Sequence, residues 1–398
     1  MTLCIVGLGY IGLPTATMFA SHGVTVVGVD ISQKAIDMIN QGKAHIIEPD
    51  LDQAVKEAVA SGRLKAQLTP ETCDYYIICV PTPFKEQPGI PDPDISYVLD
   101  AAEKIAPFLT EGAVIIIEST SPVGTTETVD QLLKDKGVTV SYHLAYCPER
   151  VLPGQILKEL INNDRVVGGM TPEGAAKAAE LYRKFVKGKI VETTAKTAEM
   201  CKLVENSFRD VNIAFANELS MICAKENVNV WELIALANLH PRVNILQPGC
   251  GVGGHCIAVD PWFIVARDPE NAKLIHQARK VNDYKADWVI ERVDKAVQKF
   301  IEKHDRDPKI ACLGLAFKPD IDDLRESPAL HITAALVGKS YDVLAVEPHV
   351  ESHGALRLAS LQEALGEADI FVALVKHSAF KGIDFGDRLV MDFCGLGN

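Results

Sequence analysis

Cys256 follows a stretch that carries four glycines between positions 249 and 254. Glycines at this density let the backbone approach a bulky group closely. If a helix begins at Cys256, Asp260 lies one turn further on, where it can handle protons or orient a water. A thiol at a helix N-terminus is shifted toward the reactive thiolate, so the pattern predicts Cys256 as a nucleophile. Cys250 is the competing nucleophile in the same stretch, and the other cysteines are interpreted as buried thiols.

A second pattern, Gly7-x-Gly9-x-x-Gly12, directly follows the apolar run Leu3–Val6. Such glycines permit a tight turn in which a pyrophosphate approaches backbone N–H groups at a helix N-terminus. Asp30 ends the next apolar run, where it can accept a hydrogen bond from a ribose hydroxyl. Because Asp30 would repel a 2′-phosphate and no arginine directly follows it, the pattern favours NAD over NADP. A methyltransferase-like nucleoside site and a flavin site are the alternatives.

Hydroxyl residues follow two further apolar runs, in Val-Pro-Thr-Pro at 80–83 and Glu-Ser-Thr-Ser-Pro at 118–122. Ligands bind at the carboxyl ends of the strands in sheets of this kind. A hydroxyl there can reach a nicotinamide or a bound water, and it can equally cap the next helix. Capping is favoured for Ser119 and Ser121, whereas both interpretations stay open for Thr82 and Thr120.

Glu199, Lys202, Asn206 and Arg209 follow one another at steps of three, four and three residues. This spacing places all four on one face of a helix. A solvated charged face is the usual explanation for such a run. An amide between two cations instead favours a directed polar site.

Lys318 and Arg325 lie in the segment that follows the apolar run Ile310–Phe317. In a nucleotide-binding sheet this is the place of the phosphate loop, although the glycine pattern is missing here. The two cations would contact phosphate groups in a chain that is otherwise too acidic to attract anions. A surface loop whose charges compensate one another is the alternative.

The composition bounds the possible partners. The 398 residues include 40 Lys and Arg against 53 Asp and Glu, a formal net charge of −13, which argues against nucleic acid and membrane surfaces as partners. No apolar run approaches the roughly 18–20 residues that cross a bilayer, so we expect no membrane insertion. Ten scattered cysteines without a CxxC pair predict reduced thiols in a cytoplasmic protein, with neither disulfides nor a metal site.

The pattern of the elements that must position these residues predicts an α/β protein. We expect two Rossmann-like, doubly wound parallel sheets joined by a helical region. Apolar runs alternate with helical stretches over residues 1–192 and again over 305–398. Between them, over 193–304, we expect one helix from Thr193 or Thr194 through Glu218 and a spine helix from about Ala272 to Lys303. The spine helix either forms a dimer interface or merely links two domains. The expected strands are Leu3–Val6, Val24–Val29, Tyr75–Val80, Val114–Glu118, Val138–Ala145, Ile310–Phe317, Tyr341–Val346, Ile370–Val375 and Leu389–Phe393.

Together these motifs resemble the nucleotide-sugar 6-dehydrogenase family, which includes UDP-glucose and GDP-mannose dehydrogenases. The resemblance covers essentially the whole chain, in the same order. The UDP-glucose branch usually reads Gly-Gly-Tyr-Cys-Leu-Pro-Lys-Asp around its cysteine, whereas this chain reads Gly-Gly-His-Cys-Ile-Ala-Val-Asp at 253–260. That departure, with the stretches that begin at Cys147, Asn206 and His240, is similar to the branch that oxidises UDP-N-acetyl-D-mannosamine. The UDP-N-acetylglucosamine 6-dehydrogenases are the close alternative.

The resemblance implies a UDP-sugar substrate, NAD as the cofactor, no metal, and a homodimer in which Arg242 reaches the neighbouring subunit's site. The last residues, 393–398, depart from the family's usual ending, so no C-terminal substrate contact is implied. The implied cofactor contacts are the glycines Gly7, Gly9 and Gly12 together with Tyr10, Ile11, Asp30, Thr82, Thr120 and Arg325. The implied substrate contacts are Arg150, Val151, Lys202, Asn206, Arg209, His240, Arg242, Gly253, Phe317 and Lys318.

The resemblance also implies a double oxidation that supplies surface polysaccharide synthesis. Two hydrides leave C6 of the sugar in turn, and Cys256 holds the intermediate first as a thiohemiacetal and then as a thioester that is hydrolysed. The implied roles are acid/base catalysis for Lys202, oxyanion binding for Asn206, and activation of water by Asp260 with Thr120 and Glu149. A nucleotide-sensing regulator and a two-electron reductase of the β-hydroxyacid type are the alternatives, and such a reductase needs no nucleophilic cysteine.

Overall fold

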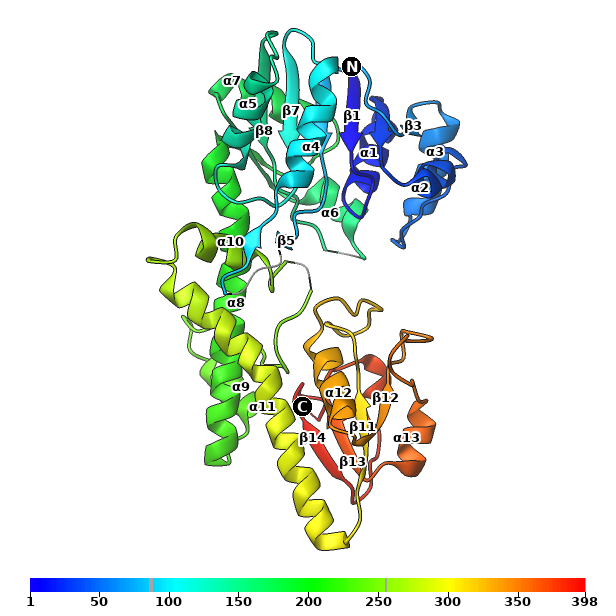
Figure 1. The fold of residues 1–398 in the computed structure, drawn as a ribbon, viewed down its shortest axis with the longest axis vertical. Coiled ribbons are helices and arrows are strands. Elements are labelled where there is room, and N and C mark those ends of the chain that lie inside the picture. The colour runs from blue at the N-terminus through cyan, green and yellow to red at the C-terminus, as the bar shows by residue number, and fades with distance from the viewer. Residues whose placement is uncertain (86–88, 153, 255, 398) are drawn as a thin grey trace. The chain divides into compact units, whose positions relative to one another are not determined.

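The computed structural model describes residues 1–85, 89–152, 154–254 and 256–397 (Figure 1). They form two compact units, Met1–Val204 and Glu205–Asn398. His255, which directly precedes the predicted nucleophile, lies outside the described residues. Across these ranges, no helix combines the length and the apolar character needed to span a membrane.

The first unit is built on an eight-stranded sheet with the order β10-β9-β8-β7-β4-β1-β2-β3. Neighbouring strands are parallel except for the pair β8 and β9, which is antiparallel. The expected doubly wound sheet is confirmed, but its expected parallel order was wrong at this edge. The strands are β1 (Thr2–Val6), β2 (Thr25–Val29), β3 (Leu64–Gln67), β4 (Tyr75–Ile78), β7 (Ala113–Ile117), β8 (Tyr142–Tyr146), β9 (Arg165–Gly169) and β10 (Ile190–Thr194).

Helices cover both faces of this sheet (Figure 1). Leu3 and Ile5 of β1 pack into one apolar cluster and Cys4 and Val6 into another, as the alternation of side chains along a strand requires. The helices are α1 (Gly12–Ser21), α2 (Gln33–Asn40), α3 (Leu51–Ala60), α4 (Ser96–Ile105), α5 (Thr125–Asp135), α6 (Ile156–Asn162) and α7 (Pro172–Tyr182). The short strands β5 (Phe84–Lys85) and β6 (Asp92–Pro93) pair antiparallel.

The second unit contains a four-stranded parallel sheet with the order β12-β11-β13-β14. The strand expected at 310–317 ends at Leu313, because Gly314 adopts a φ of +93° that no strand can continue. The elements are β11 (Lys309–Leu313), α12 (Pro328–Gly338), β12 (Asp342–Val346), α13 (Leu361–Glu367), β13 (Ile370–Ala373) and β14 (Leu389–Asp392).

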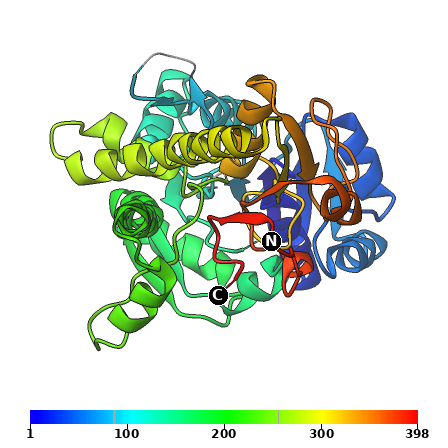
Figure 2. The same cartoon turned by 90° about the horizontal axis from the view of Figure 1, so that it is seen from below.

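Two long helices provide the helical region, and Figure 2 shows α8 (Ala195–Glu226) nearly end-on. The cap at its start is Thr194, whose Oγ1 accepts a hydrogen bond from the Thr197 N–H at 3.2 Å. This helix runs two turns beyond the expected end. The spine helix, α11 (Lys273–His304), has the expected bounds to within one residue, and the shorter α9 (Val230–Ala237) and α10 (Asp260–Arg267) lie between the two in sequence.

A buried polar ladder joins α8 to α11 inside the second unit. The Asp210 carboxylate accepts hydrogen bonds from Arg279 at 2.7 Å and from Asn282 at 2.8 Å. Asn282 in turn accepts from Asn217 at 2.9 Å. Because buried polar groups must keep their partners, this ladder fixes the register of the two helices.

Candidate active site

The glycine loop after β1 is shaped by close backbone contacts. Gly7 has a φ of +93°, and a Cβ there would overlap the Cys79 carbonyl. A Cβ on Gly12 would overlap the Gly7 carbonyl, so α1 can begin only with glycine at that position. Gly9 has no atom within 4 Å of where a Cβ would lie, which leaves its backbone open to a ligand.

Asp30 lies at the end of β2, next to this loop. Its Oδ2 accepts a hydrogen bond from the Leu8 N–H at 2.9 Å, which orients the carboxylate. Tyr10, on the same loop, is exposed, and Ile11 is half-buried. An open backbone turn at a helix N-terminus with an oriented acid beside it fits a dinucleotide, so these residues could hold NAD.

The hydroxyls at the strand ends bind one another's backbone. The Thr82 Oγ1 donates to the Thr120 carbonyl at 2.6 Å, and the Ser119 Oγ donates to the Val80 carbonyl at 2.8 Å. Ser121 likewise donates to the Ser119 carbonyl. The capping role expected for Ser119 and Ser121 was therefore wrong, because the Ser119 hydroxyl joins the loops after β4 and β7 and the Ser121 hydroxyl is used within its own loop.

Glu149 belongs to a buried charged cluster beneath these loops. The Arg165 guanidinium contacts it at 2.8 Å and lies 3.8 Å from the Glu118 carboxylate. Tyr182 and Cys79 also donate to Glu118, at 2.6 and 3.1 Å. Burial raises the pKa of Glu118, and Arg165 opposes that shift. The sequence reasoning missed Arg165, although a charged residue at the start of the apolar run Arg-Val-Val-Gly-Gly was a signal for it.

Three of the four polar residues that share one face of α8 are buried. The Glu199 carboxylate accepts three hydrogen bonds from Gly124 and Thr126, at 2.6 to 2.8 Å, which ties α8 to the N-terminus of α5. Lys202 and Asn206 are buried as well, and only Arg209 is exposed. The interpretation of these residues as a solvated charged face therefore holds for Arg209 alone.

Cys256 lies in a turn directly before α10. The Asp260 N–H donates to the Cys256 carbonyl at 2.8 Å, but the helix itself begins at Asp260. The helix start predicted at the cysteine was therefore wrong by four residues, because Pro261 sets the first turn. The Asp260 carboxylate is buried and accepts a hydrogen bond from the Asn206 amide at 2.5 Å, so the second unit brings three of the predicted residues together.

Burial distinguishes Cys256 from every other cysteine. All ten lie within the described ranges as thiols, and Cys256 alone is exposed. Cys250 is buried with its Sγ 3.5 Å from the Leu374 carbonyl, and burial raises its pKa to about 12. A thiol with that pKa stays protonated near neutral pH, which removes Cys250 as the competing nucleophile.

The glycines before Cys256 pack against the segment that follows β11. A Cβ on Gly253 would lie 2.8 Å from the Phe317 Cβ and would overlap the Glu326 carbonyl. A Cβ on Gly254 would lie 2.9 Å from the Phe317 ring. The bulky group that these glycines accommodate is therefore the 317–328 segment of the same unit.

Lys318 and Arg325 are both exposed on that segment. The Arg325 guanidinium makes a two-pronged contact with Asp323, at 2.8 and 2.6 Å. At Arg325 the structure thus agrees with the alternative, a surface loop whose charges compensate one another. A phosphate could bind the Arg325 guanidinium only by replacing Asp323. Such an exchange costs little, since an exposed ion pair contributes only about 0–1 kcal/mol.

The second sheet repeats the geometry of the first. The Gly314 N–H donates to the Val346 carbonyl at 2.8 Å, as Gly7 does to Val29, and the Leu315 N–H donates to the Glu347 carboxylate at 2.7 Å. Glu347 thus matches Asp30 in position, but it is buried against His377 at 3.1 Å. Burial opposes its ionisation, yet the hydrogen bonds from His377 and from backbone N–H groups outweigh burial and lower its pKa. The sequence reasoning missed Glu347, although an acid that directly follows a strand was the signal used for Asp30.

Asp320, His349 and His377 form the one group with metal-like spacing in the described part of the chain. The His377 Nδ1 accepts a hydrogen bond from the Asp320 N–H at 2.9 Å. Its Nε2 must then carry the proton that it shares with Glu347. Because neither nitrogen has a lone pair left for a metal, we interpret this group as structural.

The remaining predicted contacts lie on surface segments. The Arg150 guanidinium donates to the Asp164 carbonyl, and Val151 is half-buried. His240 and Arg242 are exposed beyond α9, and the Arg242 N–H donates to the His240 Nδ1 at 3.3 Å.

Comparisons with known proteins agree with this geometry. Three family models match the chain in order: the NAD binding domain of the UDP-glucose/GDP-mannose dehydrogenase family over residues 1–186, its central domain over 196–284, and its UDP binding domain over 311–394. The chain belongs to the UDP-glucose/GDP-mannose dehydrogenase family. This membership confirms the resemblance and makes NAD the cofactor of the first unit.

Several members of the family are similar over nearly their whole length. The UDP-N-acetyl-D-mannosamine dehydrogenase of Escherichia coli (strain K12) is 56% identical, over 98% of this chain and 96% of its own. The NDP-N-acetyl-D-galactosaminuronic acid dehydrogenase of Ralstonia nicotianae is 52% identical, over 99% and 96%. A solved UDP-D-ManNAc dehydrogenase from Pyrococcus horikoshii has a TM-score of 0.90 at 42% identity, covering 100% of this chain and 96% of its own.

Proposed function

We propose that this family member oxidises the C6 hydroxymethyl group of UDP-N-acetyl-D-mannosamine to the carboxylate, in two NAD-dependent steps. The observation that carries the proposal is Cys256, the one exposed thiol among ten, beside the Asp260–Asn206 pair. An exposed cysteine in such a turn suits the capture of an aldehyde. The Escherichia coli relative, named for this substrate, supports the choice of sugar.

The chain's own residues divide the work of the first oxidation. NAD, when bound, accepts the hydride that leaves C6. Lys202 takes the hydroxyl proton, and the Cys256 sulfur then bonds to the aldehyde carbon to give a thiohemiacetal. Asn206 uses one amide N–H for Asp260, so its second N–H remains to stabilise the oxyanion.

After loss of the second hydride, water cleaves the thioester and releases Cys256. In our proposal Asp260 accepts a proton from that water, while Thr120 and Glu149 position it. The contact with Arg165 fixes the Glu149 carboxylate, which suits a positioning role. The balance is one sugar alcohol, one water and two NAD⁺ giving one carboxylate, two NADH and three protons.

We assign the cofactor and substrate contacts by region. Residues 1–192 hold NAD, 193–304 form the dimerisation region, and 305–398 hold the UDP group. The cofactor contacts are Gly7, Gly9, Tyr10, Ile11, Gly12, Asp30, Thr82, Thr120 and Arg325. The substrate contacts are Arg150, Val151, Lys202, Asn206, Arg209, His240, Arg242, Gly253, Phe317 and Lys318.

We also propose a cytoplasmic homodimer that uses α8. Phe208, Phe215 and Ile222 are 68%, 51% and 52% exposed and recur every seven residues, so they form one apolar line along the helix. A second copy covering this line would bring the exposed Arg242 toward its neighbour's substrate. The cytoplasm is supported by the ten reduced thiols.

A panel of nucleotide sugars tests the substrate. We expect NADH release with UDP-N-acetyl-D-mannosamine at a kcat/KM at least tenfold above that with the N-acetylglucosamine and N-acetylgalactosamine analogues. A preference for the galactosamine analogue would instead favour the activity for which the Ralstonia relative is named. No NADH from any member of the panel would contradict the proposed enzyme and favour a nucleotide-sensing regulator.

A further inference from the structure

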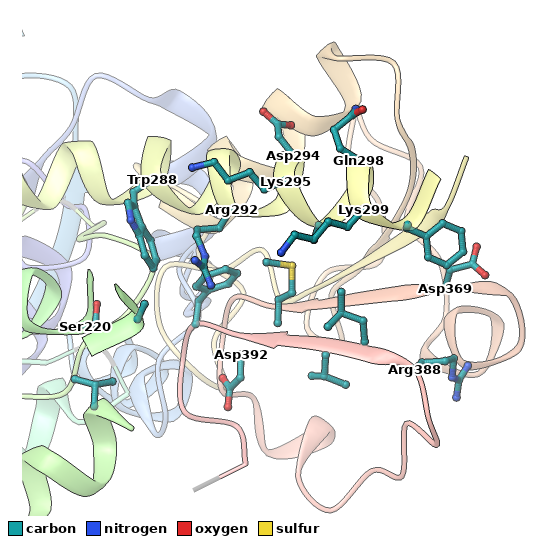
Figure 3. Close-up of a pocket in the computed structure, with 18 of the residues that line it drawn as sticks. Ser220, Trp288, Arg292, Asp294, Lys295, Gln298, Lys299, Asp369, Arg388 and Asp392 are labelled. Carbon is teal, nitrogen blue, oxygen red and sulfur yellow. The ribbon is translucent and has the colours of Figure 1, made fainter. Parts of the chain in front are cut away.

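A pocket with a volume of about 1080 Å³ lies within the second unit, away from every residue assigned above. Its walls come from α11, the corner between α8 and α9, and strand β14. In Figure 3, Trp288, Arg292 and Lys299 point from α11 toward β14. The volume slightly exceeds the range for small-molecule sites, about 300–1,000 Å³.

The cations of the pocket lack acidic partners. Lys285, Arg292 and Lys299 recur every seven residues, so they follow one line along α11 that spans about 21 Å. Among the residues that the structure describes, none of the three has a carboxylate within 4.0 Å. In a chain with a net charge of −13, such an unpaired row of cations is unexpected.

Three of the four acids that line the pocket are engaged with other groups. Asp294 pairs with Lys339 at 2.7 Å, and Asp369 pairs with Arg306. Asp392 accepts backbone N–H groups, including that of Gly395 at 2.8 Å. The fourth acid, Asp387, is outnumbered by the lysines and arginines of the lining, so the charge around the pocket is net positive.

Lys285 is the most strongly constrained of these cations. It is only 2% exposed and donates to the Ser220 hydroxyl at 2.6 Å. Its Nζ lies 3.9 Å from the centre of the Trp288 ring, and the Arg292 guanidinium lies 5.6 Å from the same ring. Lys285 and Arg292 thus share one indole, and among the described residues the hydrogen-bond partner of Lys285 is the neutral Ser220 hydroxyl, so a bound anion would stabilise the protonated amine.

We infer that this pocket binds a polyphosphate anion, along the row formed by Lys285, Arg292 and Lys299. An elongated anion with several charges matches a row of that length, and guanidinium groups bind phosphate oxygens in pairs. Trp288 and Phe393 offer an apolar wall to any organic part of the ligand. The inference uses none of the residues of the proposed dehydrogenase site, so it stands or fails separately.

Isothermal titration calorimetry of the full chain with inorganic tripolyphosphate tests this site. NAD and UDP are kept saturating, so that the two nucleotide sites are filled. We expect one saturable site per chain, weakened at least tenfold in the double variant R292Q/K299Q. The matched control K280Q, an exposed lysine of α11 that does not line the pocket, keeps the affinity of the wild type.

The two sources of such an anion are separated by a titration with ATP. Binding at least tenfold tighter than that of tripolyphosphate supports a nucleotide, and equal binding supports a bare phosphate chain. Absence of saturable binding, or equal affinity in wild type and double variant, overturns the inference. The inference is also overturned if the double variant differs from wild type in oligomeric mass alone, because the pocket would then be an interface between two copies.

Discussion

At the scale of single residues, burial decides which groups can react. Cys256 is exposed, whereas burial raises the pKa of Cys250, Cys4 and Cys312 and keeps these thiols protonated. The same reasoning applies to cations. Lys285 is buried, and burial lowers the pKa of its amine far enough to predict a stability effect.

Lys285 gives a pH-dependent prediction. Burial lowers its pKa from 10.5 to about 7, while Cys250 and Arg292 are the charged or titratable groups that influence it. Between these two pH values the unfolded chain holds a proton that the folded chain has lost, so stability rises with pH. Between pH 7 and 9 we expect the free energy of unfolding of the wild type to rise, relative to that of Lys285→Met, by up to about 1.4 kcal/mol per pH unit. Urea unfolding of both proteins measures this, and parallel pH profiles would contradict it.

Arg165 gives a prediction about the charged cluster. Its replacement in Arg165→Met leaves Glu118 and Glu149 buried without a cation, so the free energy of unfolding should fall by about 3–5 kcal/mol. Adding Glu118→Gln removes one of the two acids and should recover part of that loss. Chemical denaturation of the single and double variants tests this, and a double variant less stable than the single one would refute it.

At the scale of elements, the loop before Cys256 depends on glycine. We expect Gly253→Ala to cost about 1–3 kcal/mol of stability and at least tenfold in kcat, because its Cβ would displace Phe317 and the Glu326 carbonyl. Gly366→Ala, on α13 of the same unit with open space around the Cβ, is the matched control. The control should be neutral or slightly stabilising. Equal activity of the two variants would contradict a tightly packed loop.

The sequence predicted the elements that carry strong periodicity and missed the weak ones. The strand before Asp30 was found because it is continuously apolar, and the long α11 was found because its helical hydrophobic period continues over many turns. The strands β3, β9 and β10 were missed. Residues of β3 and β10 are partly exposed and include charged side chains, and β9 begins with Arg165 and ends in two glycines. Cys256 and its glycines were visible as a motif, but the register that joins Asn206 to Asp260 depends on tertiary packing.

At the scale of the whole molecule, the proposed homodimer predicts different roles for the two long helices. The double variant Phe208→Glu/Phe215→Glu should sediment as a monomer, because two charges would face the partner across the apolar line of α8. Leu274→Glu, on an exposed position of α11, is the control and should leave the dimer intact. A monomer only with Leu274→Glu would instead place the interface on the spine helix.

In the proposed reaction one thiol, that of Cys256, holds the sugar through two oxidations, so the ratio of NADH formed to sugar consumed reports on it without further assumptions. NADH formed is measured against UDP-N-acetyl-D-mannosamine consumed, with the acid product quantified by mass spectrometry. We expect two NADH per sugar for wild type and no free acid from Cys256→Ser. One NADH per sugar, or acid from Cys256→Ser at the wild-type rate, would contradict it.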